Sequence, residues 1–184
     1  MRGAFLAGLI FLFAGAASPA PAADAYGDCS KYVTDDNTVK QGIAICGRLI
    51  ASGKHKGLDL SRLLSNRAAG YIKDKNLDRA LADVDRALSI SPDYAFGHSH
   101  RGEVLRLRGD FDGAVTAYNT AIRLDPSFIV AYYDRAGVHL KRGDRQKARA
   151  DYQATLDLKG QGRPIDVWAK DAARKALESM AKEN

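Results

Sequence analysis

The sequence has few of the residues that build catalytic or metal sites. Its 184 residues include four histidines and two cysteines. His98 and His100 stand two positions apart, so on a helix they would point to different faces and would not share a metal ion. The motifs G-x-S-x-G and H-E-x-x-H, the phosphate-binding loop and the dinucleotide fingerprint are all missing. We therefore expect no enzymatic activity, no metal and no cofactor.

Proline, aromatic residues and long apolar runs are also scarce. Five prolines and 8% aromatic residues suit a helical protein, and 184 residues suit one compact domain. Apolar residues make up 46% and charged residues 27% of the chain, which excludes a wholly disordered protein.

The most apolar run covers residues 4–17 and follows Arg2. It is short for a membrane-spanning helix, which needs about 20 apolar residues. A basic start, a short apolar run and the Ala-Pro-Ala of 20–22 predict a secretory signal peptide over 1–22. Residues 23–25 form a second candidate cleavage site, and an uncleaved membrane anchor is the alternative.

Acidic residues are outnumbered, since 28 Lys and Arg against 22 Asp and Glu give a net charge of +6. In an exported protein this excess points to anionic envelope polymers, lipid headgroups or acidic proteins, and not to nucleic acid. The excess is modest, so it also fits a feature that only keeps the protein soluble.

The two cysteines, Cys29 and Cys46, lie near the start of the expected mature chain. Exported chains meet oxidising conditions, so we expect a disulfide between them. The C-x-x-C spacing of redox-active pairs is missing. Two free thiols or a metal pair are the alternatives.

What the sequence does contain is a repeat of 34 residues. Three segments align without gaps: 61–94, 95–128 and 129–162. Small residues that would let two antiparallel helices approach closely share two columns, with Ala68, Gly102 and Ala136 in one and Ala80, Ala114 and Ala148 in the other.

Residues that end and begin helices recur at the same interval. Gly109 and Gly143 can adopt the left-handed conformation that ends a helix, and Asp110 and Asp144 can cap the next one. Prolines 92 and 126 would stop the second helices. The third copy has Thr155 and Gly160 in place of alanine and proline, which we attribute to the solvent-facing position of a terminal copy.

The period and the order of its aromatic, small and proline columns resemble the tetratricopeptide repeat, over about 100 residues. The resemblance implies an all-α fold, a right-handed α-solenoid of about three helix-turn-helix repeats. We expect a signal peptide (1–22), a disulfide-stapled half-repeat and loop (23–60), three repeats (61–162) and a C-terminal capping helix (163–184).

The flanking segments also look helical. GIAICGRLI at 42–50 is similar to AVTAYNTAI at 114–122, the second helix of the second repeat, which suggests a half-repeat. Exported bacterial repeat proteins that resemble this chain often carry such a cysteine-bearing lead helix, so we expect a periplasmic protein.

At the other end, Pro164 suits the first residue of a helix. One face of that helix should cover the third repeat, and its members are Ile165, Trp168, Ala172, Ala176 and Met180. We expect Trp168 to pack in the core there; stacking on a ligand is the alternative.

Arg67, Arg101 and Arg135 recur at the 34-residue interval. We expect them to pair with carboxylates of the second helices, such as Asp83 and Asp151, because a repeated charge usually satisfies a repeated neighbour. A ladder of cations for an anionic ligand is the alternative.

The family resemblance implies that the first helices line a concave groove. The residues at these positions combine aromatic and hydrogen-bonding groups, which suits an extended peptide or a helix of a partner protein. They are Arg62, Ser65, Asn66, Ala69, Lys73, Phe96, Ser99, His100, Glu103, Arg106, Val130, Tyr133, Asp134, Gly137 and Lys141. A solvated face without a ligand is the alternative.

One subtype of the family grips the C-terminal carboxylates of chaperones with lysine, asparagine and arginine. Its positions correspond here to Ser65, Ala69, His100, Val130 and Asp134. None of them matches, so we do not expect that role.

A basic cluster spans the turn of the third repeat and the start of the second helix of that repeat. It consists of Lys141, Arg142, Arg145, Lys147 and Arg149. It could contact acidic lipid or polysaccharide, but we favour a solvated rim. We expect a non-enzymatic periplasmic adaptor or assembly factor; the alternative is an envelope-associated factor that binds anionic glycan or membrane through this basic face.

Overall fold

The computed structural model describes residues 29–31, 37–160 and 162–182. The predicted signal peptide lies outside these residues. Within them the regular structure is helical, and no helix is long and apolar enough to cross a membrane. The longer helices are α2 (Val39–Ala51), α3 (Gly57–Lys73), α4 (Leu77–Ile90), α5 (Ala95–Leu107), α6 (Phe111–Leu124), α7 (Ile129–Lys141), α8 (Arg145–Asp157) and α9 (Pro164–Lys182).

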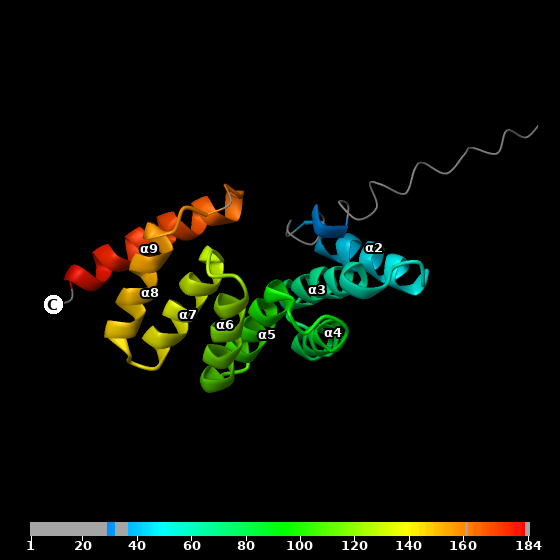
Figure 1. Ribbon diagram of the computed structural model, residues 1–184, viewed down its shortest axis with the longest axis horizontal. Helices are drawn as coiled ribbons and strands as arrows, with labels where there is room; N and C mark the ends of the chain where they lie inside the picture. The colour runs from blue at the N-terminus through cyan, green and yellow to red at the C-terminus, as the bar shows by residue number, and fades with distance from the viewer. Residues whose placement is uncertain (1–28, 32–36, 161, 183–184) are drawn as a thin grey trace, which may run out of the picture.

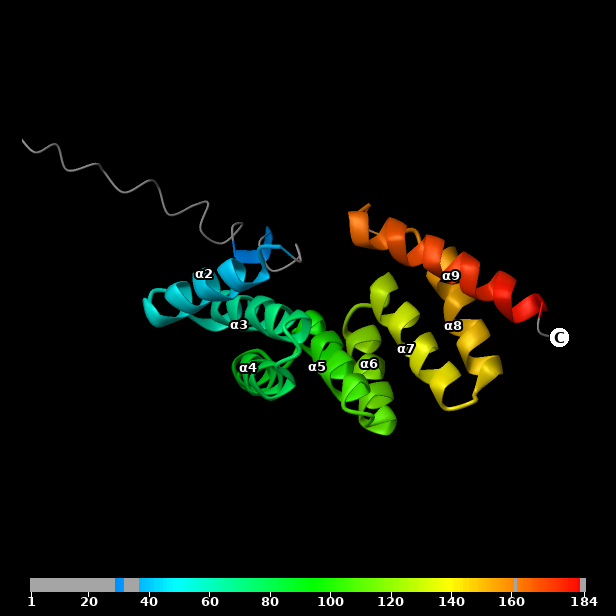
Figure 2. The ribbon, with the colours of Figure 1, turned by 180° about the vertical axis from the view of Figure 1, so that it is seen from behind.

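The helices pack in successive pairs along the chain (Figures 1 and 2). Each predicted repeat supplies one antiparallel pair: α3 with α4, α5 with α6 and α7 with α8. The first helices α3, α5 and α7 also contact one another in order, as in an α-solenoid. The predicted all-α solenoid is confirmed. Helix α3 begins at Gly57, inside the segment that the sequence pattern assigned to a loop.

The small residues of the two repeat columns lie where the two helices of a pair cross. Ala68, Ala80 and Ala114 have no exposed surface. At Gly102 the approach leaves no room for a side chain, because a Cβ there would lie 2.8 Å from a ring carbon of Tyr118. Glycine in α5 therefore makes room for a tyrosine from α6 at a position where the first repeat has Val84.

The turns between the paired helices show why glycine recurs in them. Gly109 and Gly143 have φ of +82° and +80°, the left-handed region that glycine adopts without steric cost. The equivalent residue of the first repeat is Lys75, with φ of +59°. A lysine in this conformation carries the strain of its Cβ, so the first turn is less favourable than the other two.

One of the two predicted aspartate caps is present. Asp110 accepts a hydrogen bond from the backbone N–H of Gly113 at 2.9 Å. The prediction for Asp144 is wrong, since its side chain does not cap α8. Its carboxylate instead lies between cations, 3.7 Å from Lys147 Nζ and 3.7 Å from Arg142 Nε.

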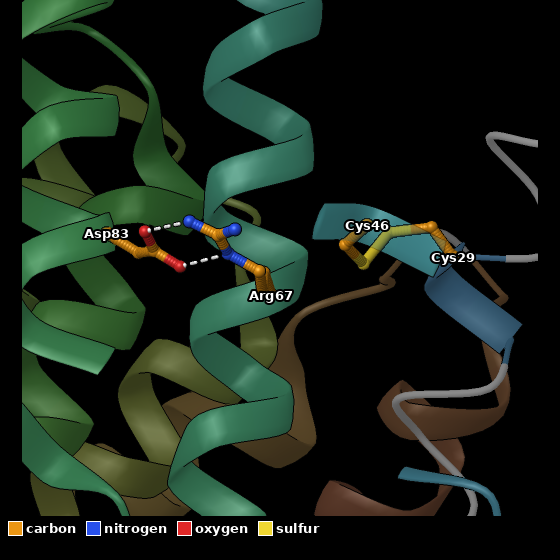
Figure 3. The surroundings of a disulfide bond; sticks show 4 residues. All are labelled: Cys29, Cys46, Arg67 and Asp83. Atoms are coloured by element: carbon orange, nitrogen blue, oxygen red, sulfur yellow. Dashed lines mark hydrogen bonds and ion pairs between the residues drawn. A yellow bond between two sulfur atoms is a disulfide. The ribbon is translucent and has the colours of Figure 1, made fainter. Parts of the chain in front are cut away.

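The predicted pairing of the repeated arginines with carboxylates is also observed. Arg67 donates two hydrogen bonds of 2.7 Å to Asp83 (Figure 3), and Arg135 donates two, of 2.8 and 2.6 Å, to Asp151. In each pair the aspartate lies 16 positions after the arginine, on the second helix of the same repeat.

The second repeat has Ala117 at that position, so Arg101 turns the other way. It pairs at 3.1 Å with Asp85, which lies 16 positions before it on the preceding repeat. Each of the three arginines thus pairs with a carboxylate inside the stack. The interpretation as a cation ladder for a ligand is wrong.

A disulfide joins Cys29 to Cys46 in α2, as predicted (Figure 3). Both cysteines are fully buried and pack with Leu63 of α3. The bond therefore anchors residues 29–31 to the N-terminal end of the solenoid. Closing such a loop stabilises a fold by about 3 kcal/mol in the chain-entropy model.

Helix α9 covers α8 and part of α7. Its buried residues include Ala169, Ala173 and Met180, so the covering face is rotated by about one residue from the predicted one. The expectation that Trp168 packs in the core is wrong, because 52% of its surface is exposed.

The end of the third repeat departs from the pattern for a reason other than solvent exposure. Thr155 is fully buried. Gly160 has φ of +75°, and a Cβ on it would lie 2.6 Å from Cδ1 of Ile129. The positive φ and the contact with Ile129 favour glycine at this point, so the attribution to a solvent-facing end is wrong.

Candidate functional site

The concave side of the stack carries two adjoining hollows, of about 430 and 360 Å³. Their walls come from the first helices α5 and α7 and from the first turns of α9, with the end of α3 at one rim. Helix α9 reaches them because its N-terminal end points back toward the middle of the molecule (Figures 1 and 2). We call the two hollows together the groove.

Most of the predicted groove residues line these hollows. They are Lys73, Phe96, Ser99, His100, Glu103, Arg106, Val130, Tyr133, Asp134, Gly137 and Lys141. Four predicted residues, all from α3, do not: Arg62, Ser65, Asn66 and Ala69. Arg62 is exposed and lies 3.4 Å from Asp59.

Ser65 is buried and hydrogen-bonded to Nδ1 of His100 at 2.7 Å. Burial lowers the pKa of His100, which keeps its ring neutral in this contact. The serine is therefore satisfied within the protein and does not face a ligand.

The larger hollow is mostly apolar. Phe96 and Phe128 lie with ring centroids 4.5 Å apart, and Ile165 of α9 also lines this hollow. The guanidinium of Arg163 lies over both phenyl rings, 5.4 and 5.5 Å from their centroids. This contact connects the segment before α9 to α5.

The smaller hollow holds charged and aromatic groups together. Tyr133 and Trp168 meet edge to face at 5.1 Å, and Tyr152 from α8 lies behind Tyr133 at 5.7 Å. Burial raises the pKa of Tyr152 to about 12, so this tyrosine stays neutral.

Asp134 lies in both hollows, beside Glu103 of the neighbouring helix. Burial and, to a smaller extent, the charge of Glu103 raise the pKa of its carboxyl to about 7, while Arg106 opposes both. Folding has thus placed a carboxyl where its charged form is disfavoured.

The hydroxyl of Tyr118 lies beneath the same groups. The tyrosine is fully buried, and its oxygen has no hydrogen-bond partner within the described chain. Burial and the charges of Asp134 and Glu103 raise its pKa well above the usual value, while the neighbouring Arg106 lowers it.

Sequence reasoning missed four residues of the groove: Phe128, Tyr152, Ile165 and Trp168. The only signal for them was the lone tryptophan, whose alternative interpretation was stacking on a ligand. The other three lie in a turn, in a second helix and in the capping helix, outside the positions implied by the family resemblance.

The basic cluster is partly neutralised by neighbouring carboxylates. Arg142 pairs with Asp112 at 2.6 Å, and Lys147 lies 3.7 Å from Asp144. Arg145 donates to the backbone oxygen of Met180 at 3.3 Å. These contacts favour a solvated rim over a binding face for anions.

No group of three or more His, Cys, Asp or Glu side chains that could hold a metal ion occurs among the residues with described positions.

Comparison with known proteins agrees with this architecture. The family model described as TPR repeat matches residues 102–143. The first TPR of Spaghetti (RPAP3), bound to HSP90 peptide SRMEEVD, is 20% identical, with 70% of this chain and 98% of that chain covered and a TM-score of 0.57.

Two further solved structures are similar at 18% identity. YrrB, a TPR protein with an unusual peptide-binding site, covers 80% of this chain and 73% of its own, with a TM-score of 0.58. The Sgt2 TPR domain from Aspergillus fumigatus covers 69% and 85%, with a TM-score of 0.57. These likenesses show the fold of a tetratricopeptide-repeat solenoid, and the family model identifies one such repeat at residues 102–143.

Proposed function

We propose that the chain is a non-enzymatic interaction module that holds a peptide or helical segment of a partner protein in its groove. The observation that carries this proposal is the exposed Trp168 between the two hollows. An exposed tryptophan beside apolar and charged groups is typical of the residues that dominate binding energy at interfaces.

Similar folds support the proposal. Two of the similar structures are described by the peptides or peptide-binding sites they carry. Two hollows of a few hundred Å³ in a row suit successive side chains of a bound segment better than one compact metabolite.

In-cell crosslinking and pull-down of the exported protein tests the proposal. A partner captured by the wild type should be lost with Trp168→Ala. Val167→Ala is the matched control, since Val167 is 61% exposed on the same turn but lines neither hollow. Capture that is equal for all three proteins would refute the groove as the binding site.

The cellular location belongs to the same proposal. Residues 1–22 have the composition of a signal peptide, and a disulfide between Cys29 and Cys46 forms in oxidising compartments. We expect periplasmic fractionation and a mature N-terminus at Ala23 or shortly after it. A full-length protein in the cytoplasmic or membrane fraction would contradict this part alone.

A further inference from the structure

We propose that the centre of the groove binds a basic side chain, arginine or lysine, of the partner segment. Its charge would lie against Glu103 and Asp134, and its stem against the ring of Trp168. The inference rests on the proposed function and names the chemistry that the groove selects.

Position is the first reason. Glu103, Asp134 and Trp168 are the residues that line both hollows. A segment that fills both hollows must therefore pass these three side chains. The cations of the groove are divided, with Arg106 and Lys141 at the smaller hollow and Lys73 at the larger one.

The second reason is that the two carboxylates are not satisfied. Across the described parts of the chain, neither Glu103 nor Asp134 forms a hydrogen bond or an ion pair, although both lie partly buried. Carboxylates elsewhere in the stack are held by arginines, as in Asp83 with Arg67. A carboxylate without a partner in a partly buried site is destabilising, and a cation from outside would relieve this.

An independent observation is the hydroxyl of Tyr118 beneath the carboxylates. It is fully buried with no partner in hydrogen-bond geometry among the described residues, its ring packs on Gly102, and the charge of Arg106 acts on it beside those of Glu103 and Asp134. Native structures rarely leave a buried hydroxyl unpaired unless a ligand, ion or water completes it. The two carboxyl groups that line the hollows are acceptors, and a guanidinium supplies five N–H donors.

The aromatic wall is the third reason. Cations are attracted to the face of an indole ring more strongly than to other aromatic rings. About half of Trp168 is exposed, and Tyr133 touches it only edge to face. The groove already contains one such arrangement, since the guanidinium of Arg163 lies over Phe96 and Phe128.

Selection of peptides from a phage-displayed library of random sequence tests the inference. Peptides that require the groove are those lost with Trp168→Ala and kept with Val167→Ala. We expect these peptides to be enriched in arginine or lysine at one position. Replacing that arginine by citrulline, which is neutral and of nearly the same shape, should weaken binding about tenfold, as for a lost hydrogen-bonded charge.

A double-mutant cycle then locates the charge. In the variant Glu103→Gln/Asp134→Asn the citrulline substitution should have little further effect, whereas Glu178→Gln on the outer side of α9 should behave like the wild type. Circular dichroism checks that each variant is folded.

The outcomes separate the two proposals. Groove-dependent peptides without a basic preference, or with acidic residues or a free C-terminal carboxylate instead, would overturn this inference and leave the interaction module intact. Peptides that ignore Trp168→Ala, or no selected peptides at all, would count against the proposed function itself.

Discussion

The two ends of the concave face use the same repeat positions in different ways. Asn66 of α3, His100 of α5 and Asp134 of α7 share one column of the repeat. Near α3 the polar groups pair with each other, since Ser65 bonds His100 at 2.7 Å. Near α7 and α9, Asp134 and its neighbour Glu103 have no such partner in the described chain.

This difference shows that position on the concave face does not by itself make a binding residue. A polar side chain is available to a ligand when the protein leaves its hydrogen-bonding capacity unused. At the α3 end Ser65 is satisfied by His100, and of the predicted residues only Lys73 reaches a hollow, whereas the α7 end combines carboxyl groups that are unpaired in the described chain with both hollows. The predictions below test this contrast, from the largest expected effect to the smallest.

The largest expected effect at the α7 end comes from substitutions of Tyr118. Tyr118→Ala should lower the free energy of unfolding by about 3–5 kcal/mol, because it leaves a large cavity under Gly102. Tyr118→Phe should be neutral or slightly stabilising, because the hydroxyl has no partner to lose. Urea unfolding of the two variants measures the difference. A loss above about 1 kcal/mol for Tyr118→Phe would mean that the hydroxyl is satisfied.

The arginine pairs allow a second test, on groups that the stack does satisfy. Asp151→Ala should cost about 2 kcal/mol, because it strips a bidentate partner from Arg135 in a pair whose side chains are 18% and 10% exposed. Asp85→Ala should cost about 0–1 kcal/mol, because Arg101 and Asp85 are 40% and 52% exposed. Equal losses in thermal unfolding would refute this distinction between the pairs.

The third test uses pH. The pKa of Asp134 is raised from 3.8 to about 7, so its contribution to stability is present at low pH and is lost as pH rises through about 7. Asp134→Asn should therefore gain stability over the wild type by about 1 kcal/mol more at about pH 8 than at about pH 5, a value reduced for the partial exposure of the groove.

The quantity to measure in that test is the difference in the free energy of unfolding between Asp134→Asn and the wild type. The lowered pKa of His100 works in the opposite direction, because burial disfavours its charged form as pH falls. The groups that face Asp134 are Glu103 and Arg106 from α5, Tyr118 from α6 and Tyr152 from α8. A stability difference independent of pH would contradict a raised pKa for Asp134.

The smallest effect concerns the turn at the α3 end. Lys75→Gly should raise the free energy of unfolding by about 0.5–1 kcal/mol, because glycine adopts a φ of +59° without strain. Gly109→Ala, at the equivalent turn of the next repeat, should lower it by a similar amount. Chemical denaturation compares the pair, and a destabilised Lys75→Gly would show that the lysine side chain makes an offsetting contact.

Much of the fold could be read from local patterns. The 34-residue interval predicted the three helix pairs, because each pair repeats the same small residues and turn glycines. The pairing of Arg67 with Asp83 followed from the same periodicity. The cap at Asp144 could not be read this way, because cations from two helices compete for that carboxylate.

The sequence by itself thus determined the repeat architecture and the pairs Arg67–Asp83 and Arg135–Asp151, since these follow from the 34-residue spacing. The disulfide between Cys29 and Cys46 followed from the expected oxidising compartment. Only the tertiary structure decided the face that α9 presents and the exposure of Trp168. A helical stripe of apolar residues is compatible with several rotations, and packing against α8 selects one of them. The tertiary structure likewise decided that Glu103 and Asp134 meet, because residues from neighbouring repeats become neighbours only when the helices stack.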